Sequence, residues 1–216
     1  MLNLVSGRVC GECTVCCTAP AIDNPQIQKD AGTTCRHCDA GCAIYDTRPD
    51  VCVGYFCGWR QLEIFGEDWR PDKSGVFAEL ETDIPEHLQS SVGVSLMLIG
   101  NPLKTIRHSW FVDFVATGLQ GGVPLFLALP GPTGHKGAKV SLNTPDMARA
   151  ASGPRSAVRE LLEKALKVLA RTTSNRMSCA IAATIWGASG YRSRFKACAA
   201  NSCATQSMNT RRRRLS

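Results

Sequence analysis

Four cysteines fall within eight residues near the start of the chain, in the stretch CGECTVCC, and two of them are adjacent. Cys10, Cys13 and Cys16 recur at every third position and Cys17 follows directly, so one tight turn can direct several sulfur atoms toward one point. A disulfide suits this spacing poorly, because its Cβ atoms must lie roughly 3.8 Å apart in a restricted torsion. Thiolates around a metal ion suit it well, since Zn–S bonds of about 2.3 Å let closely spaced cysteines share one tetrahedral ion.

The segment that follows supplies further sulfur ligands. It contains a second Cys-x-x-Cys pair and three more cysteines, so nine of the twelve cysteines lie within the first 57 residues. This density is typical of disulfide-bonded or metal-held scaffolds. The candidate metal ligands are Cys10, Cys13, Cys16, Cys17, Cys35, Cys38, Cys42, Cys52 and Cys57.

The expected cellular compartment separates metal ligands from disulfides. The first residues, MLNLVSGR, lack the basic and apolar regions of a secretory signal. The longest apolar runs, VSLMLI and VPLFLAL, are far shorter than the roughly 18 residues of a membrane span. We therefore expect a cytoplasmic chain without a membrane segment. Dense Cys-x-x-Cys spacing in a reducing cytosol indicates metal binding.

The order of motifs carries a family resemblance. CGECTVCC is followed by CRHC at residues 35–38, then by GCAIYDTRPDVC and FCGW. Together, over about residues 8–60, they closely resemble the YkgJ-type cysteine-cluster family, whose members are described as zinc- or iron-chelating proteins. The resemblance implies a metal or iron–sulfur centre and no particular reaction. One departure is Val53, where the family pattern leads us to expect an arginine.

The identity of the metal stays open at this point. Cys10, Cys13 and Cys16 match the start of a ferredoxin motif, but the chain contains no Cys-Pro. Nine thiols are enough for two four-thiolate zinc sites with one spare, or for one cluster and one zinc ion. The leading hypothesis is a metal-binding protein that holds zinc or iron, and the alternative is an iron–sulfur redox protein or enzyme subunit. His37 is either a further ligand or a partly exposed polar residue of the loop.

The remaining residues of this segment have structural interpretations. Arg48 and Pro49 predict a turn into a short helix, capped by Asp46 or Thr47. Arg48 itself either forms a surface ion pair or donates hydrogen bonds that offset the charge of several thiolates. We expect a small hydrophobic plug in a module that has little other core. It would consist of Tyr45, Phe56 and Trp59.

Ordinary globular patterning begins after Trp59. The alternation at 75–82 and the apolar run at 92–100 predict strands, and VPLFLAL at 123–129 predicts a third. Helices are expected from about 109 to the glycine pair at 121–122 and over 154–170. The predicted fold class is α+β, with a metal-held module at 1–60 and a small α+β layer at 61–170.

Motifs for catalysis are weak in the α+β region. GPTGHKG contains glycine and lysine but lacks the phosphate-binding pattern Gly-x4-Gly-Lys-Ser/Thr, which favours an exposed loop. The histidines of this region, His87, His108 and His135, are scattered without a nucleophile motif beside them. We therefore expect no defined catalytic activity and a scaffold or partner-binding surface in residues 61–170.

The last segment, 171–216, differs in charge from the rest. The net charge of +7 is the sum of −2 over residues 1–57, zero over 58–170 and +9 over 171–216. Three interpretations stay open: an arm that binds an anionic surface, a disordered extension, or a non-native segment from a shifted reading frame. A nucleic-acid partner is expected only if this basic tail is native, because residues 1–57 are net acidic. An unidentified protein partner is compatible with all three.

Overall fold

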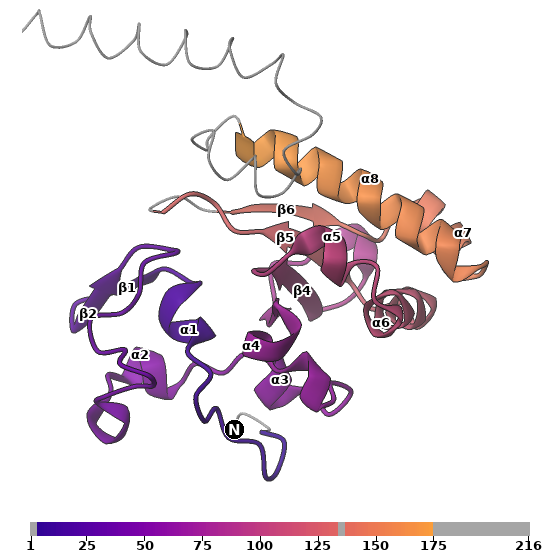
Figure 1. The fold of residues 1–216 in the computed structure, drawn as a ribbon. Helices are drawn as coiled ribbons and strands as arrows, with labels where there is room; N and C mark the ends of the chain where they lie inside the picture. Colours follow the sequence, from indigo (N-terminus) through magenta and orange to yellow (C-terminus); the bar gives the residue numbers. More distant parts are fainter. Residues whose placement is uncertain (1–3, 134–136, 175–216) are drawn as a thin grey trace, which may run out of the picture. The chain divides into compact units, whose positions relative to one another are not determined.

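A four-stranded mixed sheet is the centre of the fold (Figure 1). The structure is a computed structural model, and it describes residues 4–133 and 137–174. The outer pairs of the sheet are antiparallel and the central pair, β4 with β5, is parallel. The strands, in their spatial order, are β3 (Val76–Glu81), β4 (Gly93–Leu98), β5 (Leu125–Leu129) and β6 (Ala138–Ser141).

The parallel central pair requires a crossover, because two parallel strands cannot be joined by a hairpin. Two helices, α5 (Pro102–Thr105) and α6 (Ser109–Gln120), make this connection. The Asn101 side chain accepts a hydrogen bond of 3.0 Å from the Lys104 backbone N–H and caps α5. Every residue of β5 is buried, as expected of a parallel strand that is covered on both faces.

Three helices supply the core that faces the sheet. α6, α7 (Pro145–Ala151) and α8 (Arg155–Ser174) pack against one another, and α6 and α8 also contact β5 (Figure 1). The buried residues of each helix follow a period of three to four, which is the spacing of one helical face. They include Phe111, Val112, Val115, Met147, Val158, Leu162 and Leu169.

The structure confirms the predicted α+β class and most of the predicted elements. β3, β4 and β5 lie within the three predicted strands, and α6 has the predicted ends. α8 begins as expected and extends beyond residue 170 to Ser174. β6 and α7 were not predicted, although Thr144 and Pro145 form a helix-start signal for α7. The Thr144 hydroxyl accepts a hydrogen bond of 3.2 Å from the Met147 N–H.

The cysteine-rich segment is built from short elements. Its only strands in the described structure are a small antiparallel hairpin, and its helices each have a single turn or little more. Such short pieces bury little apolar surface of their own. In chain order they are α1 (Val15–Thr18), β1 (Ile22–Asn24), β2 (Ile27–Lys29), the 3-10 helix η1 (Tyr45–Thr47), α2 (Asp50–Val53) and α3 (Gly58–Gln61).

This segment is attached to the edge strand β3. The Tyr55 ring stacks on Phe77 with 6.3 Å between ring centres, and the Tyr55 hydroxyl donates 2.7 Å to the Glu79 carboxylate. Gly58 lies against Ala78, where an added Cβ would stand 3.0 Å from the Ala78 Cβ. Phe77 and Ala78 face opposite sides of the sheet, so the chain from Tyr55 to Gly58 passes around the edge of β3.

Two sequence predictions about this segment are wrong. Tyr45 is 51% exposed, and Trp59 is only 2% exposed because it joins the main core, so they form no common plug. Pro49 occupies the N-cap position of α2 without a side-chain cap, while Asp46 and Thr47 belong to η1. The reason is tertiary: α3 packs on β3, which places the Trp59 side chain in the main core.

Residue 60, the predicted module boundary, falls inside α3, and the described residues belong to one compact unit. No helix in the described part of the chain is both long and apolar enough to cross a membrane. The basic tail from residue 175 onward and His135 lie outside the described residues.

Candidate metal centre

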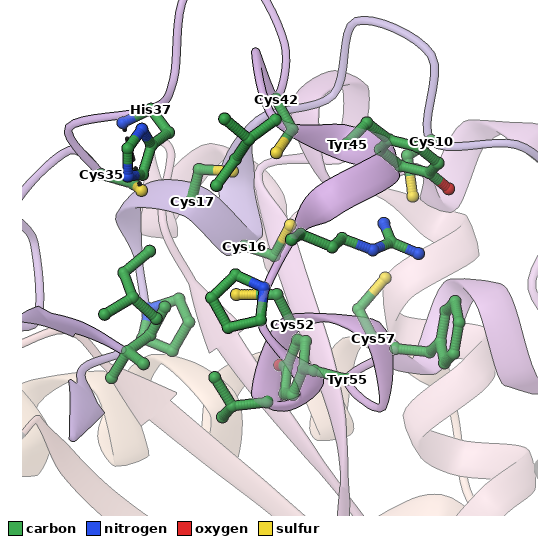
Figure 2. A pocket seen from close by; sticks show the side chains of 18 of the residues that line it. Cys10, Cys16, Cys17, Cys35, His37, Cys42, Tyr45, Cys52, Tyr55 and Cys57 are labelled. Carbon is green, nitrogen blue, oxygen red and sulfur yellow. Dashed lines mark hydrogen bonds between the residues drawn. The ribbon is translucent and has the colours of Figure 1, made fainter. Parts of the chain in front are cut away.

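One cavity of about 230 Å³ gathers the cysteines of the N-terminal segment (Figure 2). Eight of the nine predicted ligands line it, and Cys38 is the exception. His37 also lines this cavity. The lining cysteines are Cys10, Cys13, Cys16, Cys17, Cys35, Cys42, Cys52 and Cys57.

The first cysteines reach the cavity through a turn and a helix. The Cys13 N–H donates a hydrogen bond of 3.0 Å to the Cys10 carbonyl, which closes a turn. This turn contains Gly11, whose φ is +54°. A positive φ of this kind is accessible to glycine at little cost. α1 begins directly afterwards and carries Cys16 and Cys17.

The second Cys-x-x-Cys pair forms a similar turn. The Cys38 N–H donates 2.9 Å to the Cys35 carbonyl, and the Cys35 N–H donates 2.9 Å to the Cys17 carbonyl. Cys38 and Cys42 then pair as an isolated antiparallel bridge. The backbone therefore holds this second turn against α1, and its cysteines come within reach of Cys17.

Two single-turn helices bring the last cysteines. Cys52 lies within α2, and Cys57 directly precedes α3. Burial raises the pKa of the Cys57 thiol, while the backbone N–H groups of Arg60 and Trp59 partly oppose that rise. Buried backbone N–H groups at a helix start favour an anion such as thiolate.

The adjacent thiols of α1 differ in proton affinity. The Cys17 thiol donates to the Cys16 sulfur, which lowers the pKa of Cys16 and raises that of Cys17. The Cys38 thiol in turn donates toward Cys17. Burial raises the pKa of Cys13, Cys38 and Cys52. Metal binding by such thiols must displace their protons, so it is coupled to pH.

The donor set fits a thiophilic metal in chemistry and number. Thiolate is the ligand that zinc and iron–sulfur clusters share, and either centre takes four. In the described residues, no three Cys, His, Asp or Glu side chains converge closely enough to hold an ion. A tetrahedral zinc site brings its sulfurs to about 3.8 Å from one another. Binding therefore requires cysteine side chains around the cavity to turn inward.

Basic side chains surround these thiols, although the segment is net acidic. Lys29 is 9% exposed, and its ammonium donates to the carbonyls of Thr18 and Pro20. Burial lowers the pKa of Lys29, while the neighbouring Cys35 and Cys17 sulfurs partly oppose this. The sequence analysis did not single out Lys29. Its spacing of two residues from Ile27, which places both side chains on the buried face of β2, is the pattern that could have identified it.

Two arginines line the cavity itself. The Arg48 guanidinium stacks 3.9 Å from the centre of the Tyr45 ring, and it makes no ion pair within the described structure. The Nε and Nη1 atoms of Arg60 are buried without a hydrogen-bond partner in the described residues. The Arg60 guanidinium lies 5.6 Å from the centre of the Phe56 ring. Unpartnered buried donors are rare and call for an acceptor.

Arg8 links the first cysteine turn to the segment after Cys57. Its guanidinium donates to the backbone carbonyls of Trp59 and Phe65, and 2.9 Å to that of Leu62. It also lies 5.3 Å from the centre of the Trp59 ring. Arg8 thereby satisfies carbonyls left open at the end of a short helix. Sequence analysis missed this residue, since nothing local distinguishes it.

The other residues named from the sequence differ in whether they lie at the cavity. His37 lies at the cavity beside Cys35 (Figure 2). Its Nε2 atom accepts a hydrogen bond of 3.1 Å from the Arg36 side chain, so one ring nitrogen already has a partner. Val53 is 46% exposed and does not line the cavity. His87 and His108 are exposed on the α+β region, where His108 stacks on a tryptophan.

Comparison of the chain with protein-family models, with curated proteins and with solved structures gives no match. The resemblance to the YkgJ-type family therefore stays a prediction from the residues that carry it.

Proposed function

We propose that this chain is a metal-binding protein that holds zinc or iron through its N-terminal cysteine cluster. The observation that carries the proposal is the gathering of eight predicted ligands around one cavity. These cysteines come from separate turns and helices spread over residues 10–57. Spacing along the sequence accounts for neighbours such as Cys10 and Cys13, but not for the approach of Cys57 to them.

The charges around the cavity support an anionic occupant. Four thiolates around one divalent ion carry a net negative charge, which is costly to bury without nearby donors. Lys29, Arg48 and Arg60 stand beside these thiols, and two guanidinium nitrogens of Arg60 have no hydrogen-bond partner in the described residues. Charge-assisted hydrogen bonds to metal-bound sulfur would satisfy them.

The bound metal would supply structural cross-linking if it is zinc and electron transfer if it is an iron–sulfur cluster. The size of the cavity supports the iron–sulfur cluster as an alternative to zinc. About 230 Å³ exceeds the roughly 150 Å³ of a cavity that holds a benzene molecule. A cluster that contains inorganic sulfide would use such space, whereas one tetrahedral zinc would draw the sulfurs together.

Elemental analysis with an acid-labile sulfide assay on the full chain, purified without air, tests the proposal. Zinc without sulfide supports a structural centre, and iron with equal sulfide supports a redox centre. A chain that retains neither metal, and takes up neither on reconstitution, refutes the proposal. A matched control replaces Cys179, Cys198 and Cys203 by Ser, because these three cysteines lie outside the cluster in sequence. We expect this control to keep its full metal content.

A further inference from the structure

The cysteines fall into two groups according to the backbone that holds them. Group one contains Cys10, Cys13, Cys16 and Cys57. Group two contains Cys17, Cys35, Cys38, Cys42 and Cys52. The groups meet in α1, where Cys16 and Cys17 are adjacent.

The start of the chain and α3 bring group one together. The Val5 N–H donates 2.9 Å to the Arg60 carbonyl, and the Arg8 guanidinium binds carbonyls from Trp59 onward. These bonds fix the residues before Cys10 beside the helix that Cys57 precedes. Figure 2 shows Cys10 and Cys57 at one end of the cavity, away from Cys35.

Cys16 completes this first group. It lies three residues after the Cys10–Cys13 turn, and it lines the same cavity. The Cys16 sulfur accepts a hydrogen bond from the Cys17 thiol of the other group, and the thiols of Cys10, Cys13 and Cys57 also lie near it. Group one therefore has four thiols, which is the number that a zinc ion or an iron–sulfur cluster takes.

Group two is assembled by the second turn. The Cys35 N–H donates to the Cys17 carbonyl, and Cys38 pairs with Cys42 across the bridge. The Cys38 thiol contacts that of Cys17. Cys52 joins them from α2, since the thiols whose charges act on it are those of Cys35, Cys17 and Cys42.

We propose that the cluster holds two metal centres, one bound by Cys10, Cys13, Cys16 and Cys57, and the other by four of the five cysteines of group two. This inference rests on the proposed function. The adjacent Cys16 and Cys17 then serve different centres. In the structure the Cys17 thiol donates a hydrogen bond to the Cys16 sulfur, so metal binding must break this contact and turn the Cys17 thiol toward Cys35 and Cys38. The angle of about 100° between successive helix residues allows the two thiols to separate in this way. The buried Lys29 ammonium beside Cys35 and Cys17 offsets charge on the second centre.

Counting zinc in paired substitutions tests this division. The full chain is reconstituted with Zn²⁺ without air, excess ion is removed, and the bound zinc is released and measured with a chromophoric chelator. We expect two zinc ions per chain in the wild type. Cys10→Ser with Cys16→Ser removes two ligands of one centre, so one ion should remain. Both variants are built on Cys38→Ser, which leaves group two with four thiols and no spare. Cys10→Ser with Cys17→Ser then removes one ligand from each centre, so both ions should be lost or bound far more weakly.

The two variants are matched, because they differ only in which of two adjacent cysteines is replaced. Equal zinc content in both would overturn the division, and so would a single zinc ion in a wild type that is otherwise metal-loaded. A wild type that takes up no zinc, and no iron with sulfide, would instead refute the proposed function itself. Circular dichroism confirms that each variant keeps the α+β region folded, which separates ligand loss from unfolding.

Discussion

Replacing Arg8 by Met should destabilise the fold at the junction between the cysteine segment and the α+β region. The Arg8 guanidinium is half-buried and donates to four backbone carbonyls, those of Trp59, Leu62, Glu63 and Phe65. No other side chain of the described residues donates to any of these four carbonyls in the structure. Methionine keeps much of the apolar stem and removes every donor.

The magnitude follows from the number and burial of these bonds. A hydrogen bond with one charged partner contributes about 1.5–3 kcal/mol, and neighbouring bonds are not additive. We therefore expect Arg8→Met to lower the free energy of unfolding by about 3 kcal/mol, near the upper end for a single substitution. For a chain of this size, this corresponds to a fall in Tm of roughly 6–12 °C.

Urea unfolding of metal-loaded protein measures this change, and hydrogen exchange locates it. Backbone amides around Cys10 and Cys13 should exchange faster in Arg8→Met, while amides of β4 and β5 keep their relative protection. Arg107→Met is the matched control, because Arg107 forms an exposed ion pair of 3.1 Å with Glu163. Its expected cost is about 0–1 kcal/mol.

A loss below about 0.5 kcal/mol in Arg8→Met, equal to that of the control, would refute this reasoning. It would show that the four carbonyls are satisfied as well by water, and that Arg8 does not hold the first cysteine turn.

Three further changes probe the site and the core. Arg60→Met should weaken Zn²⁺ binding roughly 10–100-fold. Arg159→Met is the control, because the Arg159 guanidinium also has a buried nitrogen without a partner in the described residues but lies on α8, and it should leave Zn²⁺ binding unchanged. Competition with a chelator compares the zinc affinities of the two variants. Burial raises the pKa of Glu79, so the folded state binds its proton more tightly than the unfolded chain, and wild-type stability should fall as the pH rises from about 4.3 through the raised pKa. Glu79→Gln, which keeps an acceptor for the Tyr55 hydroxyl, should remove that slope in urea titrations; an unchanged slope would assign it to another group. Leu127→Ala in the fully buried centre of β5 should cost about 2–5 kcal/mol of unfolding free energy without changing zinc content in the folded protein; loss of zinc would contradict the separation of core and site.

The sequence by itself determined the regular elements of the α+β region. Strands such as β5 and helices such as α8 were predictable because their apolar residues repeat with the period of one buried face, and Gly121 and Gly122 mark the end of α6. β6 escaped prediction because its four residues, three half-buried and one exposed, carry too short a pattern. Cysteine spacing identified the candidate ligands as a set, since thiol chemistry is a property of residue type.

Only the tertiary structure decided which of these ligands lie together and what surrounds them. The approach of Cys57 to Cys10 depends on Arg8, which contacts residues more than fifty positions away, and on the packing of α3 against β3, where Gly58 meets Ala78 twenty positions away. The same packing placed Trp59 in the main core and left Tyr45 exposed, against the sequence prediction. Arg60, on α3, gained its position beside the thiols in this way too, whereas Lys29 is held there by the carbonyls of Thr18 and Pro20. Charge counted along the sequence is net acidic here, whereas the folded chain sets basic groups beside the cysteines, because distance in space and not in sequence governs electrostatic interaction.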